Sequence, residues 1–145
     1  MTLDSDALMA FAAEISEAAG AITRSHFGKA AVEFKGDGSE VTVADRAAEE
    51  FLLGRIGEVY PGHGVFGEEG ARTAGTGAYR WIIDPIDGTR SFAAGVPLYG
   101  VLLALEHQGR PILGCAHLPE LGETIVAAEG AGCWRNGHRR IAGRC

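Results

Sequence analysis

Two stretches of the chain carry hydrophobic residues at helical spacing. In residues 4–27 apolar side chains recur every three or four positions, and Arg24 and His26 lie near the end, where the helix dipole favours cations. A second stretch begins at Thr42 and ends at Pro61-Gly62, and its predicted buried face consists of Ala48, Phe51, Leu52, Ile56 and Val59. The pattern therefore predicts two amphipathic helices.

Shorter runs of apolar and β-branched residues are typical of strands. The last three runs are separated by turn-forming segments, which predicts an antiparallel meander, followed by two very short strands around Asn136-Gly137. Trp134 is predicted to pack against the protein, and His63 to lie in a surface loop. Apart from these two very short strands, the predicted strands are residues 31–35, 65–69, 79–83, 98–105, 111–118 and 123–128.

Composition and charge narrow the class of protein. With 145 residues, 46% hydrophobic and 22% charged, the chain has the composition of one globular domain. A net charge of −6 without a basic run disfavours a nucleic-acid partner. Asp4 and Asp6 stand where a signal peptide would be positive, no apolar run approaches a membrane-spanning length, and the three cysteines lack zinc-site spacing. We therefore expect a cytoplasmic protein with neither a nucleic-acid nor a membrane partner.

The stretch from Tyr79 to Asp87 is the strongest candidate for chemistry. Its aromatic and β-branched beginning suits a buried strand, and Pro85, which lacks an N–H group, is predicted to end the ladder just after Asp84. Asp87 follows across a predicted proline turn that can bring both carboxylates to one point. Two hard oxygen ligands so close together suit Mg²⁺.

The residues after Asp87 favour an anion. Gly88 allows close approach of the backbone to a ligand, and the amides of Gly88 and Thr89 are predicted to open a helical turn that attracts phosphate. Asp-Pro and Asp-Gly are also common turn dipeptides, so either acid could simply cap a turn. Two acids followed by Gly-Thr after a buried strand favour the functional interpretation.

The run Asp84-Pro85-Ile86-Asp87-Gly88-Thr89, preceded by Trp81-Ile82-Ile83, resembles the signature of the inositol monophosphatase superfamily of Mg²⁺-dependent, lithium-sensitive phosphatases. The resemblance implies an α+β fold in which two helices pack on an antiparallel sheet, like the first domain of the inositol monophosphatase and fructose-1,6-bisphosphatase fold. It also implies hydrolysis of a small phosphate monoester by a metal-activated water, without a covalent phosphoenzyme.

Two other segments match the same family. Thr42 and Asp45 stand at capping-box spacing, so Asp45 could merely hold the start of the second helix. Residues 41–45 also resemble the family's helix entry, whose aspartate belongs to the metal cluster, and one residue can do both. Gly67-Glu68-Glu69 could be a strand end with solvated acids, but it resembles the family motif whose first glutamate binds metal.

The resemblance assigns roles to individual residues. It implies that Glu68, Asp84 and the carbonyl of Ile86 hold a first Mg²⁺, that Asp84 and Asp87 share a second, and that Asp45 and Glu68 support a weaker third. The catalytic residues would be Glu68, Asp45 and Thr89, with Thr89 hydrogen-bonded near Glu68 to orient the attacking water. Gly88 and Thr89 would bind the substrate phosphate, and Lys35 occupies the place of a family lysine near the metals.

Substrate and domain organisation follow less directly. Residues 91–100, 114–119 and 132–137 look more like the histidinol-phosphatase branch, so histidinol phosphate is slightly favoured over inositol monophosphate. The resemblance implies that residues 1–145 form the N-terminal metal-binding domain of the family. It also implies that the family's C-terminal α/β domain, which supplies one more aspartate to the second metal, is absent. The alternative is a catalytically incomplete metal-binding or interaction module. The family also allows a homodimer.

Overall fold

A computed structural model describes residues 3–29, 32–34, 40–141 and 143 of the chain. Lys35, one of the predicted site residues, lies outside these ranges. The elements in chain order are α1 (Ser5–His26), β1 (Val32–Phe34), β2 (Glu40–Thr42), α2 (Val43–Val59), β3 (Gly64–Gly67), β4 (Arg72–Thr73), β5 (Tyr79–Asp87), α3 (Thr89–Ala93), β6 (Gly100–His107), β7 (Arg110–Leu118), the 3₁₀ turn η1 (Pro119–Leu121), β8 (Glu123–Ala128), β9 (Gly132–Arg135) and β10 (His138–Arg140).

Both predicted amphipathic helices are present, and each begins at a side-chain cap. Asp4 caps α1 by accepting hydrogen bonds from the amides of Asp6 and Ala7. Thr42 and Asp45 form the capping box of α2. The predicted buried face of α2 is confirmed for Ala48, Leu52 and Ile56 and in part for Phe51, whereas Val59 at the end of the helix is 44% exposed.

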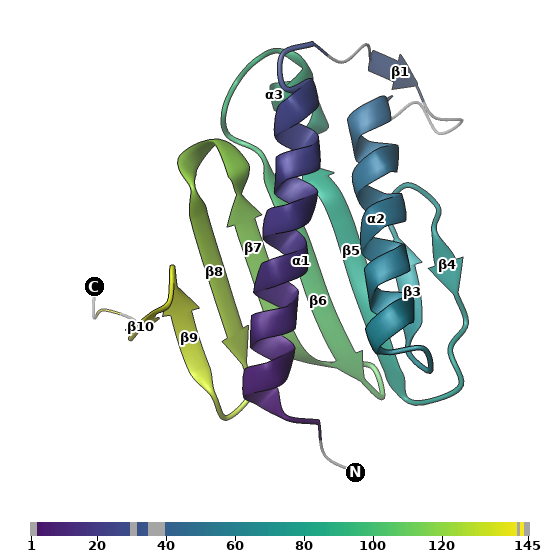
Figure 1. Ribbon diagram of the computed structural model, residues 1–145, viewed down its shortest axis with the longest axis vertical. Helices are drawn as coiled ribbons and strands as arrows, with labels where there is room; N and C mark the ends of the chain where they lie inside the picture. Colours follow the sequence, from purple (N-terminus) through teal and green to yellow (C-terminus); the bar gives the residue numbers. More distant parts are fainter. Residues whose placement is uncertain (1–2, 30–31, 35–39, 142, 144–145) are drawn as a thin grey trace.

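In the described part of the chain the strands form one eight-stranded sheet and a separate two-stranded pair, β1 with β2. The large sheet has the order β10-β9-β8-β7-β6-β5-β3-β4, and α1 and α2 lie side by side across one of its faces (Figure 1). The α+β class and the antiparallel meander of β6, β7 and β8 are confirmed. The pairing of β3 with β5 is parallel, which the expectation of an antiparallel sheet did not include.

The main core fills the space between the two helices and the sheet. Trp81 and Leu105 from the sheet and Ile15 and Leu52 from the helices are fully buried there. Trp134 packs against this core, as predicted. A smaller cluster of Ala44, Ile86, Phe92 and Tyr99 lies beside it, at the start of α2 and under α3. Among the described residues no helix is long and apolar enough to cross a membrane.

Two local predictions were wrong. Strand β5 does not end after Asp84 but continues through Pro85 to Asp87, with a shift of register against β6 between the two acids. A bulge tolerates proline because the residue there has no regular ladder hydrogen bond to make. His63 is half-buried rather than a surface residue, since its ring stacks between Tyr60 and Tyr79.

Candidate functional site

The predicted acids come together at one end of the sheet, where β3 and β5 end and where α2 and α3 begin (Figure 1). The parallel pairing of β3 with β5 explains this, because parallel strands end at the same edge of a sheet. Gly67 lies opposite Ile83, and the amide of Glu68 donates a hydrogen bond to the Ile83 carbonyl at 3.1 Å. The next residues of the two strands, Glu68 and Asp84, are thereby placed beside each other.

Asp84 is the electrostatic centre of this corner. Its side chain is half-buried, and Oδ1 is a buried atom without a hydrogen-bond partner among the described residues. Burial, followed by the repulsion of Asp87 and then of Glu68, raises the pKa of Asp84 from 3.8 to about 7. Glu69 and Asp45 add smaller repulsive contributions. An anion in this position is poorly compensated by the protein alone.

The bulge and the glycine after it shape the backbone around Asp87. The side chain of Asp87 is exposed, while Ile86 just before it is only 2% exposed and anchors the segment in the smaller core cluster. Gly88 has a φ of 88°, a left-handed conformation that favours glycine, and it is the N-cap of α3. The predicted helical turn at Thr89 is confirmed, although α3 has only five residues.

Asp45 is fully buried and links two elements of the corner. Its Oδ2 accepts hydrogen bonds from the amide and hydroxyl of Thr42, at 2.8 and 2.6 Å. Its Oδ1 lies 3.0 Å from the hydroxyl of Thr89, which also lies 3.2 Å from the Ile86 carbonyl. The capping box is therefore real, and the same carboxylate reaches the candidate site. The hydroxyl of Thr89, which the resemblance places near Glu68, thus contacts Asp45 and the Ile86 carbonyl in this structure.

Glu49 belongs to the same corner and was missed. It is buried, and its two carboxylate oxygens each accept a hydrogen bond of 2.7 Å, one from the amide of Glu69 and one from the amide of Ala71. Glu68 itself is exposed on the turn that Glu49 holds. The available signal was spacing, because Glu49 follows Asp45 by one helical turn and therefore lies on the same buried side of α2.

The chemistry of these side chains suits a divalent cation. Oxygen ligands of this type bind Mg²⁺, and a cation would compensate the buried Oδ1 of Asp84 and the repulsion that raises its pKa. Among the residues that the structure describes, however, no three Asp, Glu, His or Cys side chains are close enough to form a ready metal site. The oxygen ligands of this corner are therefore of the type that binds Mg²⁺.

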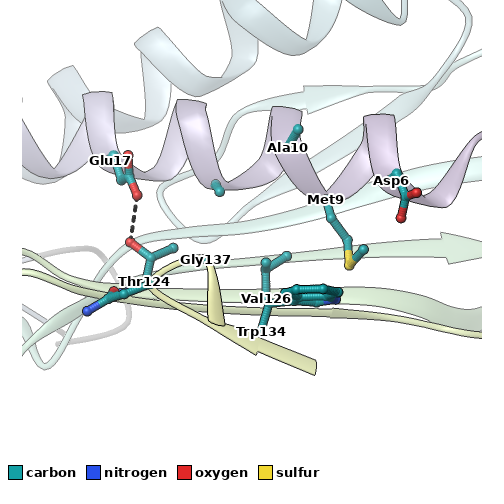
Figure 2. A pocket seen from close by; sticks show the side chains of 10 residues that line it. Asp6, Met9, Ala10, Glu17, Thr124, Val126, Trp134 and Gly137 are labelled. Carbon is teal, nitrogen blue, oxygen red and sulfur yellow. Dashed lines mark hydrogen bonds between the residues drawn. The ribbon is translucent and has the colours of Figure 1, made fainter. Parts of the chain in front are cut away.

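A separate groove lies between α1 and strands β8 and β9, with a volume of about 290 Å³ (Figure 2). Figure 2 shows Met9 of α1 above Val126 and Trp134 of the sheet, and the hydroxyl of Thr124 donating a hydrogen bond to Glu17 at 2.9 Å. None of the predicted site residues that the structure describes lines this groove. The acidic corner is therefore the candidate site on chemical grounds.

Comparison with known proteins gives consistent matches over most of the chain. Residues 4–144 match the sequence model of the Inositol monophosphatase family. A histidinol-phosphatase of Chlorobaculum parvum is 47% identical over 128 residues, which are 87% of this chain and 49% of that protein. An inositol-1-monophosphatase of Mesorhizobium japonicum is 40% identical over 115 residues, or 78% of this chain and 43% of that protein.

Solved structures agree with the fold. The IMPase of Thermotoga maritima superposes with a TM-score of 0.86 at 36% sequence identity, covering 94% of this chain and 54% of that one. The chain thus spans about half the length of the relatives and of the structure that it matches.

Proposed function

The chain belongs to the inositol monophosphatase family, and from this premise we propose that its acidic corner hydrolyses a small phosphate monoester with the help of Mg²⁺. The observation that carries the proposal is the buried Oδ1 of Asp84, which has no hydrogen-bond partner among the described residues and lies near four further acids. A carboxylate in that position is costly for a protein unless a cation compensates it. Perturbed acids of this kind gather at functional sites.

Five residues are proposed to hold the metal ions. Asp84 and Asp87 supply carboxylates from either side of the bulge in β5, Glu68 supplies one from the neighbouring turn, Asp45 contributes from the start of α2, and Ile86 offers its backbone carbonyl. Mg²⁺, when bound, neutralises the phosphoryl oxygens and lowers the pKa of a water molecule.

The protein's own groups orient the reactants. Asp45 fixes the hydroxyl of Thr89 at 3.0 Å, so that the Thr89 oxygen keeps a defined position from which it can bind and direct a water molecule. The amides of Gly88 and Thr89 are proposed to face the phosphate, because the left-handed conformation of Gly88 turns the chain into α3 at that point. Glu68 is the proposed proton acceptor beside Asp84.

The proposed substrate is histidinol phosphate or inositol monophosphate. The histidinol-phosphatase of Chlorobaculum parvum shares more identical residues with this chain than the inositol-1-monophosphatase of Mesorhizobium japonicum does, at 47% against 40%. This difference favours histidinol phosphate slightly. The specificity of a phosphatase depends on contacts to the alcohol part of the ester, and the matched residues are only about half of each relative.

A second candidate function is a metal-binding or interaction module without turnover. The observation that favours it is that the residues matched in the relatives are only about half of each of those proteins. Calorimetry that detects Mg²⁺ binding, together with no turnover of any tested phosphate ester, would support this candidate.

Phosphate release from histidinol phosphate and inositol 1-phosphate tests the proposal. We expect release to require Mg²⁺, to be lost in Asp84→Asn and to persist in Asp6→Asn, which removes an exposed acid from the first turn of α1. The Asn side chain keeps the size of Asp84 but not the negative charge that binds the cation. Release that is unaffected by Asp84→Asn would refute the proposed site.

A further inference from the structure

Glu49 connects helix α2 to the turn that carries Glu68. It is 3% exposed, and its Oε2 and Oε1 accept hydrogen bonds from the amides of Glu69 and Ala71, both at 2.7 Å. These two amides lie on either side of Gly70, so one carboxylate binds both arms of a single turn. Charge-assisted hydrogen bonds of this kind are among the strong ones in proteins.

The turn is built to admit this carboxylate. A Cβ atom placed on Gly67 would lie 2.6 Å from the Glu49 carboxylate carbon and 3.1 Å from the Cβ of Ala71. A residue with a side chain at that position would therefore displace Glu49 or the turn. The amide of Gly67 also donates to the Ala71 carbonyl at 2.7 Å, which closes the base of the turn around the Glu49 contact.

We infer that Glu49 is a positioning residue that holds Glu68 beside Asp84, an inference that rests on the proposed metal-dependent function. Glu68 is exposed, but its backbone is fixed on one side by the hydrogen bond to Ile83 and on the other by the grip of Glu49 on the next amide. Asp45, one helical turn before Glu49, reaches the same corner through Thr89. One side of α2 thus carries the proposed ligand Asp45 and, through Glu49, positions the proposed ligand Glu68.

The contact needs a carboxylate because two N–H donors point at one side chain. A glutamine at position 49 keeps the length of the side chain but has only one carbonyl oxygen. Its amide group would place N–H donors against one of the two backbone N–H groups, which leaves that group without an acceptor. The turn is then no longer held in one position, and neither is the carboxylate of Glu68 that it carries.

The contact itself can be measured in the metal-free protein by hydrogen exchange of backbone amides, followed by NMR. We expect Glu49→Gln to accelerate exchange at Glu69 or Ala71 by about tenfold, because one hydrogen bond is lost. The matched control is Glu50→Gln, which removes the next acid of α2 from an exposed position and is expected to leave both amides unchanged. Unchanged exchange in Glu49→Gln would overturn the inference.

The consequence for the metal is measured by titrating Mg²⁺ in a calorimeter. Glu49→Gln is expected to weaken binding by about tenfold, as the loss of a residue that orients a ligand does, while Glu50→Gln binds like wild type. Gly67→Ala is a second variant that retains the charge of Glu49 but displaces its carboxylate, and we expect the same weakening. Wild-type affinity in both Glu49→Gln and Gly67→Ala would overturn the positioning role.

Asp84→Asn separates this inference from the proposed function. If Asp84→Asn abolishes Mg²⁺ binding and Glu49→Gln leaves it unchanged, the metal site stands and the role of Glu49 is refuted. If Asp84→Asn binds Mg²⁺ like wild type, the proposed site itself is wrong, whatever the result for Glu49.

Discussion

Replacing Asp84 with asparagine should stabilise the metal-free protein, and the gain should depend on pH. The carboxyl group of Asp84 is held among like charges in a half-buried position, which raises its pKa from 3.8 to about 7. Asparagine has nearly the same shape without the charge. The variant therefore removes the repulsion while it leaves the packing of β5 in place.

The magnitude follows from the pKa. Folding raises the pKa of Asp84 from 3.8 to about 7, a difference of roughly three pH units. At 1.36 kcal/mol for each unit, ionised Asp84 destabilises the folded protein by about 4 kcal/mol at most. Water that reaches a half-buried carboxylate screens part of this repulsion. We therefore expect Asp84→Asn to raise the free energy of unfolding by about 1–2 kcal/mol.

The sign of the pH dependence is opposite to that of a salt-bridged aspartate. Between pH 4 and 7 the folded protein binds more protons at Asp84 than the unfolded chain does, so wild-type stability falls as pH rises through this window. The advantage of Asp84→Asn should therefore be complete near pH 8 and should shrink toward pH 4, and it should vanish at still lower pH, where Asp84 is neutral in both states.

Urea unfolding of wild type and Asp84→Asn in the presence of a chelator, at pH 5 and pH 8, measures this difference. Glu50→Gln, which removes an exposed charge from α2, is the control and should change stability little at either pH. An advantage of Asp84→Asn that is the same at pH 5 and pH 8, or a loss of stability at pH 8, would refute the electrostatic explanation.

Two further predictions concern contacts that support the fold and the site, and both are measured by urea unfolding. Gly20→Ala would place a Cβ 2.5 Å from the ring of His117 and should cost about 1–3 kcal/mol of stability. A Cβ at Gly54 would have no atom of the described residues within 4 Å, so Gly54→Ala should gain about 0.5–1 kcal/mol. Equal effects of the two variants would contradict the close packing at Gly20. Thr89→Ala removes the hydroxyl that contacts buried Asp45 and should lower the free energy of unfolding by about 1–3 kcal/mol. Thr89→Ser keeps a hydroxyl and should retain most of the wild-type stability. A serine variant no more stable than the alanine variant would contradict a role for that hydrogen bond.

The helices and the meander could be predicted because their signals are local. The apolar spacing of α1, the Thr42–Asp45 capping box and the turn at Asn136-Gly137 each depend on residues close together in the chain. Strand β5 was predicted too short because proline was taken to end a ladder. The structure places Pro85 in a bulge against β6, where the missing N–H group of proline does not interrupt a regular ladder.

Sequence patterns could indicate which residues form the candidate site but only part of how they are arranged. Glu68 and Asp84 meet because β3 pairs in parallel with β5, a long-range choice that no local pattern reveals. Glu49 was missed because a glutamate on a helix is usually solvated, and its two amide partners lie some twenty positions away in the chain. Asp45 caps α2 with one carboxylate oxygen and contacts Thr89 with the other, so its capping role leaves one oxygen directed at the candidate site.

A calorimetric titration of Mg²⁺ into the metal-free protein decides whether the acids around Asp84 bind this ion. Wild type and Asp6→Asn should bind the ion. Asp84→Asn should lose binding, because the buried oxygen, which has no hydrogen-bond partner in the described part of the chain, is then no longer charged. Absence of Mg²⁺ binding in wild type, or equal binding in wild type and Asp84→Asn, would contradict the claim.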